Sequence, residues 1–64
     1  MKTLGAKTIP VIVFNYVGEP IAIRESIMEC ARWYNVSTRR IRDRINDGKL
    51  DKDLELFFDL EITE

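Results

Sequence analysis

The pattern of hydrophobic and polar residues changes several times along the chain, and each change predicts a new element. The stretch "IPVIVFNYVGEPIAI" is rich in β-branched and aromatic residues and contains Gly18 and Pro20. Such residues favour strands, and glycine supplies the backbone freedom of a tight turn. The stretch predicts a β-hairpin with strands over Val11–Phe14 and Ile21–Ile23. Residues 1–8 have no clear period and are expected to form a loose arm.

The next stretch, "RESIMECARWYN", follows the helical period instead. Ser26 and Glu29 have the spacing of a capping box, in which the hydroxyl accepts from a free backbone N–H and the carboxylate reaches back. One apolar stripe follows at spacings of three and four residues and consists of Ile27, Cys30, Ala31 and Tyr34. We expect this helix to end at Asn35, because asparagine tolerates left-handed backbone.

A second helix is predicted over Thr38–Asn46, directly after the first. Ser37 is placed to cap its start, Gly48 follows its end, and Ile41 and Ile45 form its buried side. Two short helices joined by a three-residue corner are typical of a helix-turn-helix. The two predicted helices together therefore indicate this motif.

The final stretch, "LELFFDLEI", alternates between apolar and acidic residues, with Phe57 as the exception. Its apolar side consists of Leu54, Leu56, Phe58, Leu60 and Ile62. The alternation predicts a half-buried strand with an acidic outer face. The predicted fold class is α+β in the order β-β-α-α-β, with a small antiparallel sheet under two helices and one domain over residues 1–64.

The net charge of −1 conceals a division of charge along the chain. Residues 1–31 hold three cations and three carboxylates, residues 32–49 hold six cations against two carboxylates, and residues 50–64 hold one lysine against six carboxylates. Basic surfaces are often simply solvated. Arg40 and Arg44, however, are four residues apart on one helix and repel each other, so they add no stability there. A basic second helix in a helix-turn-helix favours nucleic acid as the partner.

A projection of the second helix at about 100° per residue separates its side chains into groups. The inner arc holds Thr38, Ile41 and Ile45. The exposed arc holds Arg39, Arg42, Asp43 and Asn46, where arginine can bond guanine bidentately and asparagine can bond adenine in a major groove. Phosphate contacts are expected from Ser37, Thr38, Arg32, Arg40, Arg44 and Lys49.

About three quarters of the chain, from Val11 to Phe58, resembles the small modular DNA-binding repeat found C-terminal to the catalytic part of phage and intron-encoded homing endonucleases. The likeness is carried by "VIVFNYVGEP", "SIMECARWYNVSTRRIRDRINDGK" and "LELFF". In that family the matching structural positions would be Ser26, Ala31, Val36, Ser37, Ile41, Ile45 and Gly48, whereas exposed residues of the second helix vary. The resemblance implies contact with double-stranded DNA through the second helix. The leading hypothesis is a small DNA-binding protein that acts as a phage or mobile-element regulator.

A protein-interaction module is the alternative function. The basic helix would bind an acidic partner protein, or the acidic last strand would imitate nucleic acid. A homodimer would double the contacts to DNA, through an uncovered sheet edge or through Trp33 and Phe57. Both aromatic residues are more simply expected in an ordinary core.

No catalytic constellation is present in the sequence. The chain has no histidine, no glycine-rich phosphate loop and no serine beside a base, so we predict a protein that is not an enzyme and needs no cofactor or metal. Cys30 lies on an apolar stripe, which predicts a buried thiol rather than a reactive one. The longest apolar run is too short to cross a bilayer and no signal peptide is recognised, so we expect a cytoplasmic protein of a bacterial or phage-infected cell without a membrane partner.

Overall fold

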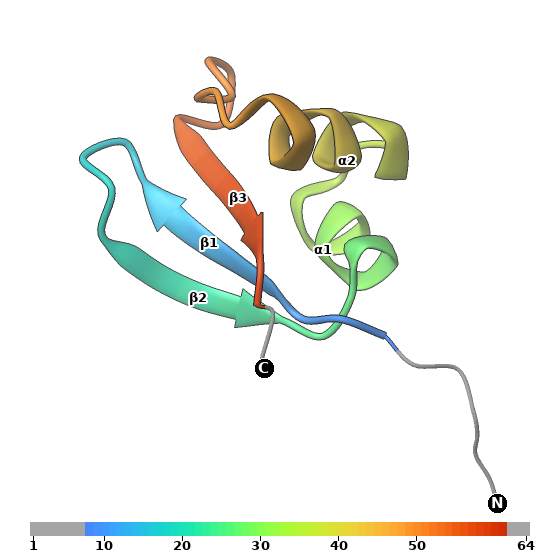
Figure 1. Cartoon of the computed structure of the whole chain (residues 1–64). Helices are drawn as coiled ribbons and strands as arrows, with labels where there is room; N and C mark the ends of the chain where they lie inside the picture. The colour runs from blue at the N-terminus through green and yellow to red at the C-terminus, as the bar shows by residue number, and fades with distance from the viewer. Residues whose placement is uncertain (1–7, 62–64) are drawn as a thin grey trace, which may run out of the picture.

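Three strands form one antiparallel sheet in the computed structural model, which describes residues 8–61. The strands are β1 (Val11–Asn15), β2 (Pro20–Arg24) and β3 (Leu56–Leu60). Their order in the sheet is β2-β1-β3, so β1 is central and the last strand pairs with the hairpin, as predicted (Figure 1). The register places Val13 opposite Ala22 on one side and Phe58 on the other. The predicted α+β class and the order β-β-α-α-β are confirmed.

The hairpin turn is held by the side chain of Asn15. Its Oδ1 accepts from the backbone N–H of Val17 at 3.1 Å and from that of Glu19 at 2.8 Å. Gly18 has a φ of 90°, a backbone conformation that costs glycine little because it has no Cβ. Pro20 then opens β2 opposite Phe14, where the register of the pair shifts by one residue.

Both predicted helices are present, as α1 (Ile27–Tyr34) and α2 (Thr38–Asp47). Each begins at a serine whose hydroxyl accepts a backbone N–H at 3.1 Å, from Glu29 to Ser26 in α1 and from Arg40 to Ser37 in α2. The predicted capping box needs one correction. The Glu29 carboxylate accepts from the N–H of Glu25, one residue before the cap, because the chain approaches the helix in extended backbone.

The corner between the helices depends on Asn35, which adopts the left-handed conformation with a φ of 60°. The next N–H, of Val36, donates to the Ala31 carbonyl at 2.9 Å and closes the end of α1. Gly48 ends α2 in the same manner, with a φ of 67° and an N–H that donates to the Arg44 carbonyl. The chain therefore reverses direction after each helix at the residues that the sequence indicates.

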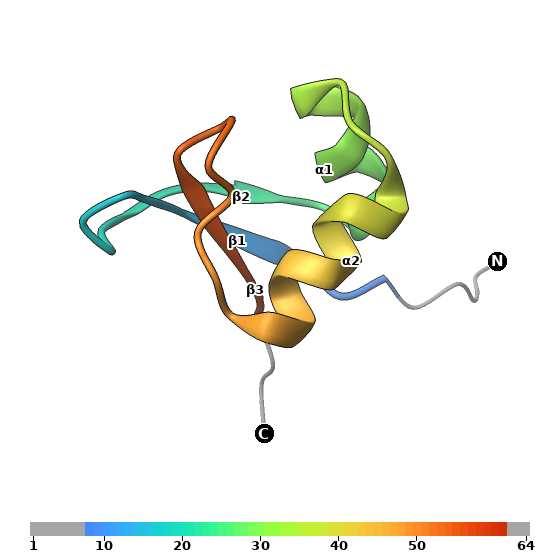
Figure 2. The ribbon, with the colours of Figure 1, turned by 90° about the horizontal axis from the view of Figure 1, so that it is seen from above.

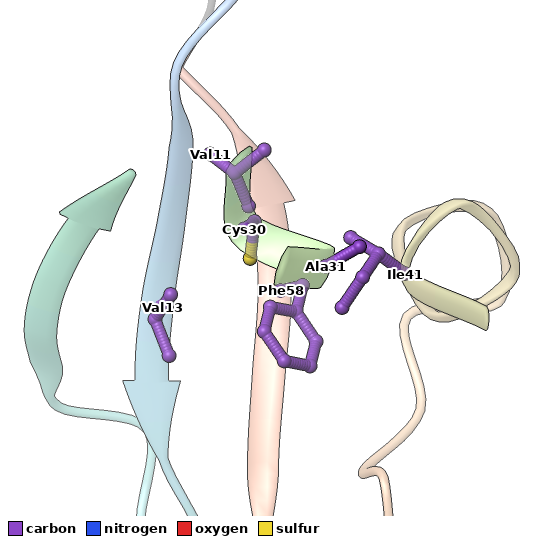
Figure 3. Close-up of a cluster of buried hydrophobic side chains, with 6 residues drawn as sticks. All are labelled: Val11, Val13, Cys30, Ala31, Ile41 and Phe58. Carbon is purple, nitrogen blue, oxygen red and sulfur yellow. The ribbon is translucent and has the colours of Figure 1, made fainter. Parts of the chain in front are cut away.

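The core lies between the sheet and the two helices. Its buried residues are Val11, Val13, Cys30, Ala31, Ile41 and Phe58, from β1, β3, α1 and α2 (Figure 3). The Tyr34 ring meets the Phe58 ring edge-on with centroids 5.8 Å apart. The Cys30 thiol is buried as predicted, and burial raises its pKa to about 11. In residues 8–61, no helix is both long and apolar enough to span a membrane.

Two predictions about the core and the last strand are wrong. Trp33 was expected in the core but is 63 % exposed, and the central carbon of the Arg24 guanidinium lies 4.1 Å from its ring centroid. Phe57, for which the core was also expected, is half-buried. The last strand begins at Leu56 instead of Leu54, because residues 51–55 form a turn in which Glu55 has a positive φ of 58°. Ile62 and most of the predicted N-terminal arm lie outside the described residues.

Candidate nucleic-acid interface

Helix α2 packs through one side only. Ile41 is fully buried in the core and Ile45 packs partly against it, so both lie toward α1 and the sheet. The helical period turns side chains two residues away from Ile41 toward the outside. Both views place α2 at the edge of the molecule, with β3 and α1 as its neighbours (Figures 1 and 2).

The outer side of α2 carries the polar residues that the projection placed there. We call this set the exposed arc; it consists of Arg39, Arg42, Asp43 and Asn46, all of which are exposed. Neither arginine of the exposed arc forms an ion pair with a carboxylate of residues 8–61. Their guanidinium groups are therefore available to an external acceptor.

Arg40, one residue along, has a different environment. Its Nε and Nη2 donate to the two carboxylate oxygens of Asp51 at 2.7 and 2.6 Å, and Nη2 also donates to Asp53 at 3.1 Å. The Asp51 side chain is only 3 % exposed, and its Oδ1 also accepts the N–H of Leu54. The hydrogen bonds from Arg40 hold the pKa of Asp51 below its usual range, and Asp51 in turn raises the pKa of Arg40.

This fork-shaped contact joins α2 to the turn that precedes β3. The same turn is closed by the N–H of Asp51, which donates to the Leu56 carbonyl, and by the N–H of Glu55, which donates to the Asp51 carbonyl. Arg40 is therefore engaged within the protein, and the phosphate contact predicted for it stays a prediction. Arg44 lies on the same flank and pairs with Asp47 at 2.8 Å.

The remaining predicted residues surround the start and end of α2. Ser37 is exposed and uses its oxygen as the helix cap, which leaves its hydroxyl hydrogen free to donate, whereas Thr38 is half-buried. Lys49 is exposed just past the helix. Lys52, which the sequence interpretation did not select, is also exposed and lines the same shallow groove beside α2 as Ser37, Arg39 and Lys49.

Lys52 was missed because the sequence places it in an acidic segment. Gly48 could have indicated the position of Lys52. A left-handed residue after a helix directs the following chain back along the side of that helix, which brings Lys52 beside α2. Of the eight cations in residues 8–61, five have no ion pair within those residues: Arg32, Arg39, Arg42, Lys49 and Lys52. These five define the positive charge available to a partner.

Within residues 8–61, no cluster of three or more potential ligands is placed to hold a metal ion. Comparison of the chain with protein-family models, curated proteins and solved structures found no match. The resemblance to the modular DNA-binding repeat therefore stays a prediction.

Proposed function

We propose that this protein binds double-stranded DNA by inserting the exposed arc of α2 into the major groove. The observation that carries the proposal is the pair Arg39 and Arg42, which project from an uncovered helix face without an ion pair to residues 8–61. The hypothesis of a phage or mobile-element regulator supplies the context of this proposal.

The chemistry of the exposed arc suits base edges. Arginine donates two hydrogen bonds to guanine O6 and N7, and asparagine pairs with adenine N6 and N7. Arg39, Arg42 and Asn46 supply these groups from one helix face. Asp43 accepts from the cytosine amino group and repels phosphate, so it favours a position over bases rather than over the backbone.

Phosphate contacts come from residues around the exposed arc. The Ser37 hydroxyl and the exposed Lys49 and Lys52 lie at the two ends of α2 and in the following turn. Phosphate contacts fix the orientation of a protein on the duplex and make its affinity depend on salt. Arg40 contributes indirectly, because its contact with Asp51 fixes α2 relative to the turn that carries Lys52.

The test is fluorescence anisotropy with a random-sequence duplex at about 50 and about 200 mM salt. With no more than five free cations in residues 8–61, we expect a slope of log K against log salt of about −2 to −4. Replacing Arg39 and Arg42 together by alanine should weaken binding about tenfold or more. The matched variant with lysine at both positions should stay within about threefold, because it retains the charge.

Binding that is unchanged by the double alanine variant would contradict the proposal, as would no binding at either salt concentration by a folded sample. The second outcome favours a protein-interaction module instead. In that alternative the same two cations, Arg39 and Arg42, bind the carboxylates of an acidic partner, since neither forms an ion pair to residues 8–61. An excess of an acidic peptide tests it directly, and the same two variants then report whether the exposed arc is used.

A further inference from the structure

The side of the sheet that faces away from the helices is apolar. Side chains alternate between the two faces of a strand, so the neighbours of Val11, Val13, Ala22 and Phe58, which pack in the core, point away from the helices. We call the apolar residues among these neighbours the open face; they are Ile12, Phe14, Ile21, Ile23 and Phe57. The register makes them contiguous, because Ile12 pairs with Ile23 and Phe14 pairs with Phe57.

Nothing in residues 8–61 covers the open face. Helices α1 and α2 lie on the same side of the sheet and the opposite side is bare (Figures 1 and 2). Ile21 and Ile23 are 54 % and 59 % exposed. A sheet with one solvated face normally alternates apolar and polar residues, whereas the outward positions of β1 and β2 are apolar, which is typical of strands covered on both sides. Ile12, Phe14 and Phe57 are half-buried, so the exposed part of this face lies mainly along β2, and exposed apolar surface of this kind marks an interaction site.

The charges around the open face are negative. Asp59 lies on this face of β3 opposite Ile12, and Glu61 follows it, with its N–H bonded to the Pro10 carbonyl. Glu25 is exposed at the end of β2. The only cation of the three strands, Arg24, points toward the helices, where it contacts Trp33. The open face is therefore an apolar patch with carboxylates from both edge strands at one end, where β1 begins.

We propose that the open face binds an amphipathic helix of another protein, with apolar side chains against the sheet and lysines or arginines beside the acidic end where β1 begins. A helix laid on this face would bury it as α1 and α2 bury the other face, which gives the sheet a second covering layer. Cations along the helix would meet the carboxylates of Asp59, Glu61 and Glu25.

A second copy of the chain fits this surface less well. Asp59, Glu61 and Glu25 all lie at the end of the sheet where β1 begins, so two open faces stacked with these ends together would bring carboxylates near each other. DNA is repelled by the same charges. The proposal is independent of the DNA-binding role, since α2 lies on the other side of the sheet (Figure 1).

An amphipathic peptide of leucine and lysine, about 18 residues long, is the probe, and a peptide with glutamate in place of lysine is its control. In an amide chemical-shift titration, the lysine peptide should shift residues of the open face and leave residues 38–47 unchanged. The glutamate peptide should bind at least about tenfold more weakly. Equal binding of both peptides, or shifts confined to other surfaces, would overturn the proposal.

Variants locate the site. Replacing Ile21 and Ile23 by threonine keeps β-branched residues in β2 and should weaken the lysine peptide about tenfold. Met28→Thr removes a similarly exposed apolar side chain from α1 and should change binding less than about twofold. The double alanine variant at Arg39 and Arg42 should bind the peptide as the parent does. If the parent instead dimerises in sedimentation and the double threonine variant does not, the occupant is a second copy and the proposal is wrong.

Discussion

The two outward sides of α2 carry the same kind of residue in different surroundings. On the exposed arc, Arg39 and Arg42 have no ion pair to residues 8–61. On the flank that faces the following turn, Arg40 holds Asp51 and Asp53, and Arg44 holds Asp47. The difference shows that only some of the arginines of a helix carry positive charge that is free for a partner, because carboxylates of the same protein neutralise the others.

The comparison also assigns different roles to the two sides. The flank joins α2 to the turn before β3 through a carboxylate that is 3 % exposed, so its charges contribute to stability. The exposed arc is solvated and contributes little to stability, so its charges are available for binding. Variants on the flank should change the free energy of unfolding, and variants on the exposed arc should change affinity.

Asp51→Ala should have the largest effect. The substitution removes the acceptor of two Arg40 hydrogen bonds and of the Leu54 N–H, and leaves these donors without their partner. Loss of a buried charged partner of this kind costs about 2–4 kcal/mol in the free energy of unfolding. Urea denaturation followed by circular dichroism measures it.

The control for Asp51→Ala is Asp43→Ala on the exposed arc, which should change stability by less than about 0.5 kcal/mol. Equal losses in the two variants would show that the flank and the exposed arc do not differ in the way that their contacts indicate.

The pH dependence of stability should report the same contact with a smaller effect. Arg40 lowers the pKa of Asp51 in the folded protein. The stabilisation is therefore complete above the ordinary carboxyl pKa of about 4 and is lost as the pH falls through the lowered folded value. Asp51→Asn cannot titrate, so its deficit in unfolding free energy should narrow below about pH 4. A deficit that stays constant from pH 7 to acid would show that the ionised carboxylate is not what stabilises the turn.

The serines that cap the two helices allow a further test of the difference between residues that stabilise the fold and residues that bind DNA. Ser37→Ala and Ser26→Ala each remove a hydroxyl that accepts a backbone N–H at 3.1 Å, and each should cost about 1 kcal/mol in unfolding free energy. Only Ser37 lies beside the exposed arc, so only Ser37→Ala should also weaken DNA binding, by a few-fold. Equal effects of both variants on anisotropy would indicate that DNA binding follows global stability instead.

The sequence predicts the elements of this fold well because the signals for them are local. Ser26, Asn35, Ser37 and Gly48 mark the helix boundaries, and each acts on backbone groups within a few residues. The exposed arc follows as well, since helical geometry alone separates Arg39 and Arg42 from Ile41.

The contacts of the arginines could not be predicted in the same way. Arg40 and Asp51 are separated by 11 residues and meet only because the chain reverses at Gly48 and turns again before β3. Division of the chain into a basic and an acidic segment concealed this contact. The exposure of Trp33 could not be predicted either. Its position beside the apolar stripe of α1 suggested a place in the core, whereas its ring lies at the surface in contact with the Arg24 guanidinium.

The smallest expected effect concerns the one carboxylate on the exposed arc. Asp43 forms no ion pair to residues 8–61, so its charge acts directly on an approaching phosphate backbone. Asp43→Asn should raise affinity for a random duplex about two- to threefold and leave stability unchanged. Asp53→Asn removes an equal charge from the flank, but Arg40 already partly neutralises that carboxylate, so the gain should be smaller. Anisotropy of the two variants at low salt compares them directly. A larger gain in affinity for Asp53→Asn would mean that Arg40, once released from Asp53, contacts phosphate. Arg40 would then belong to the DNA-binding surface together with the exposed arc.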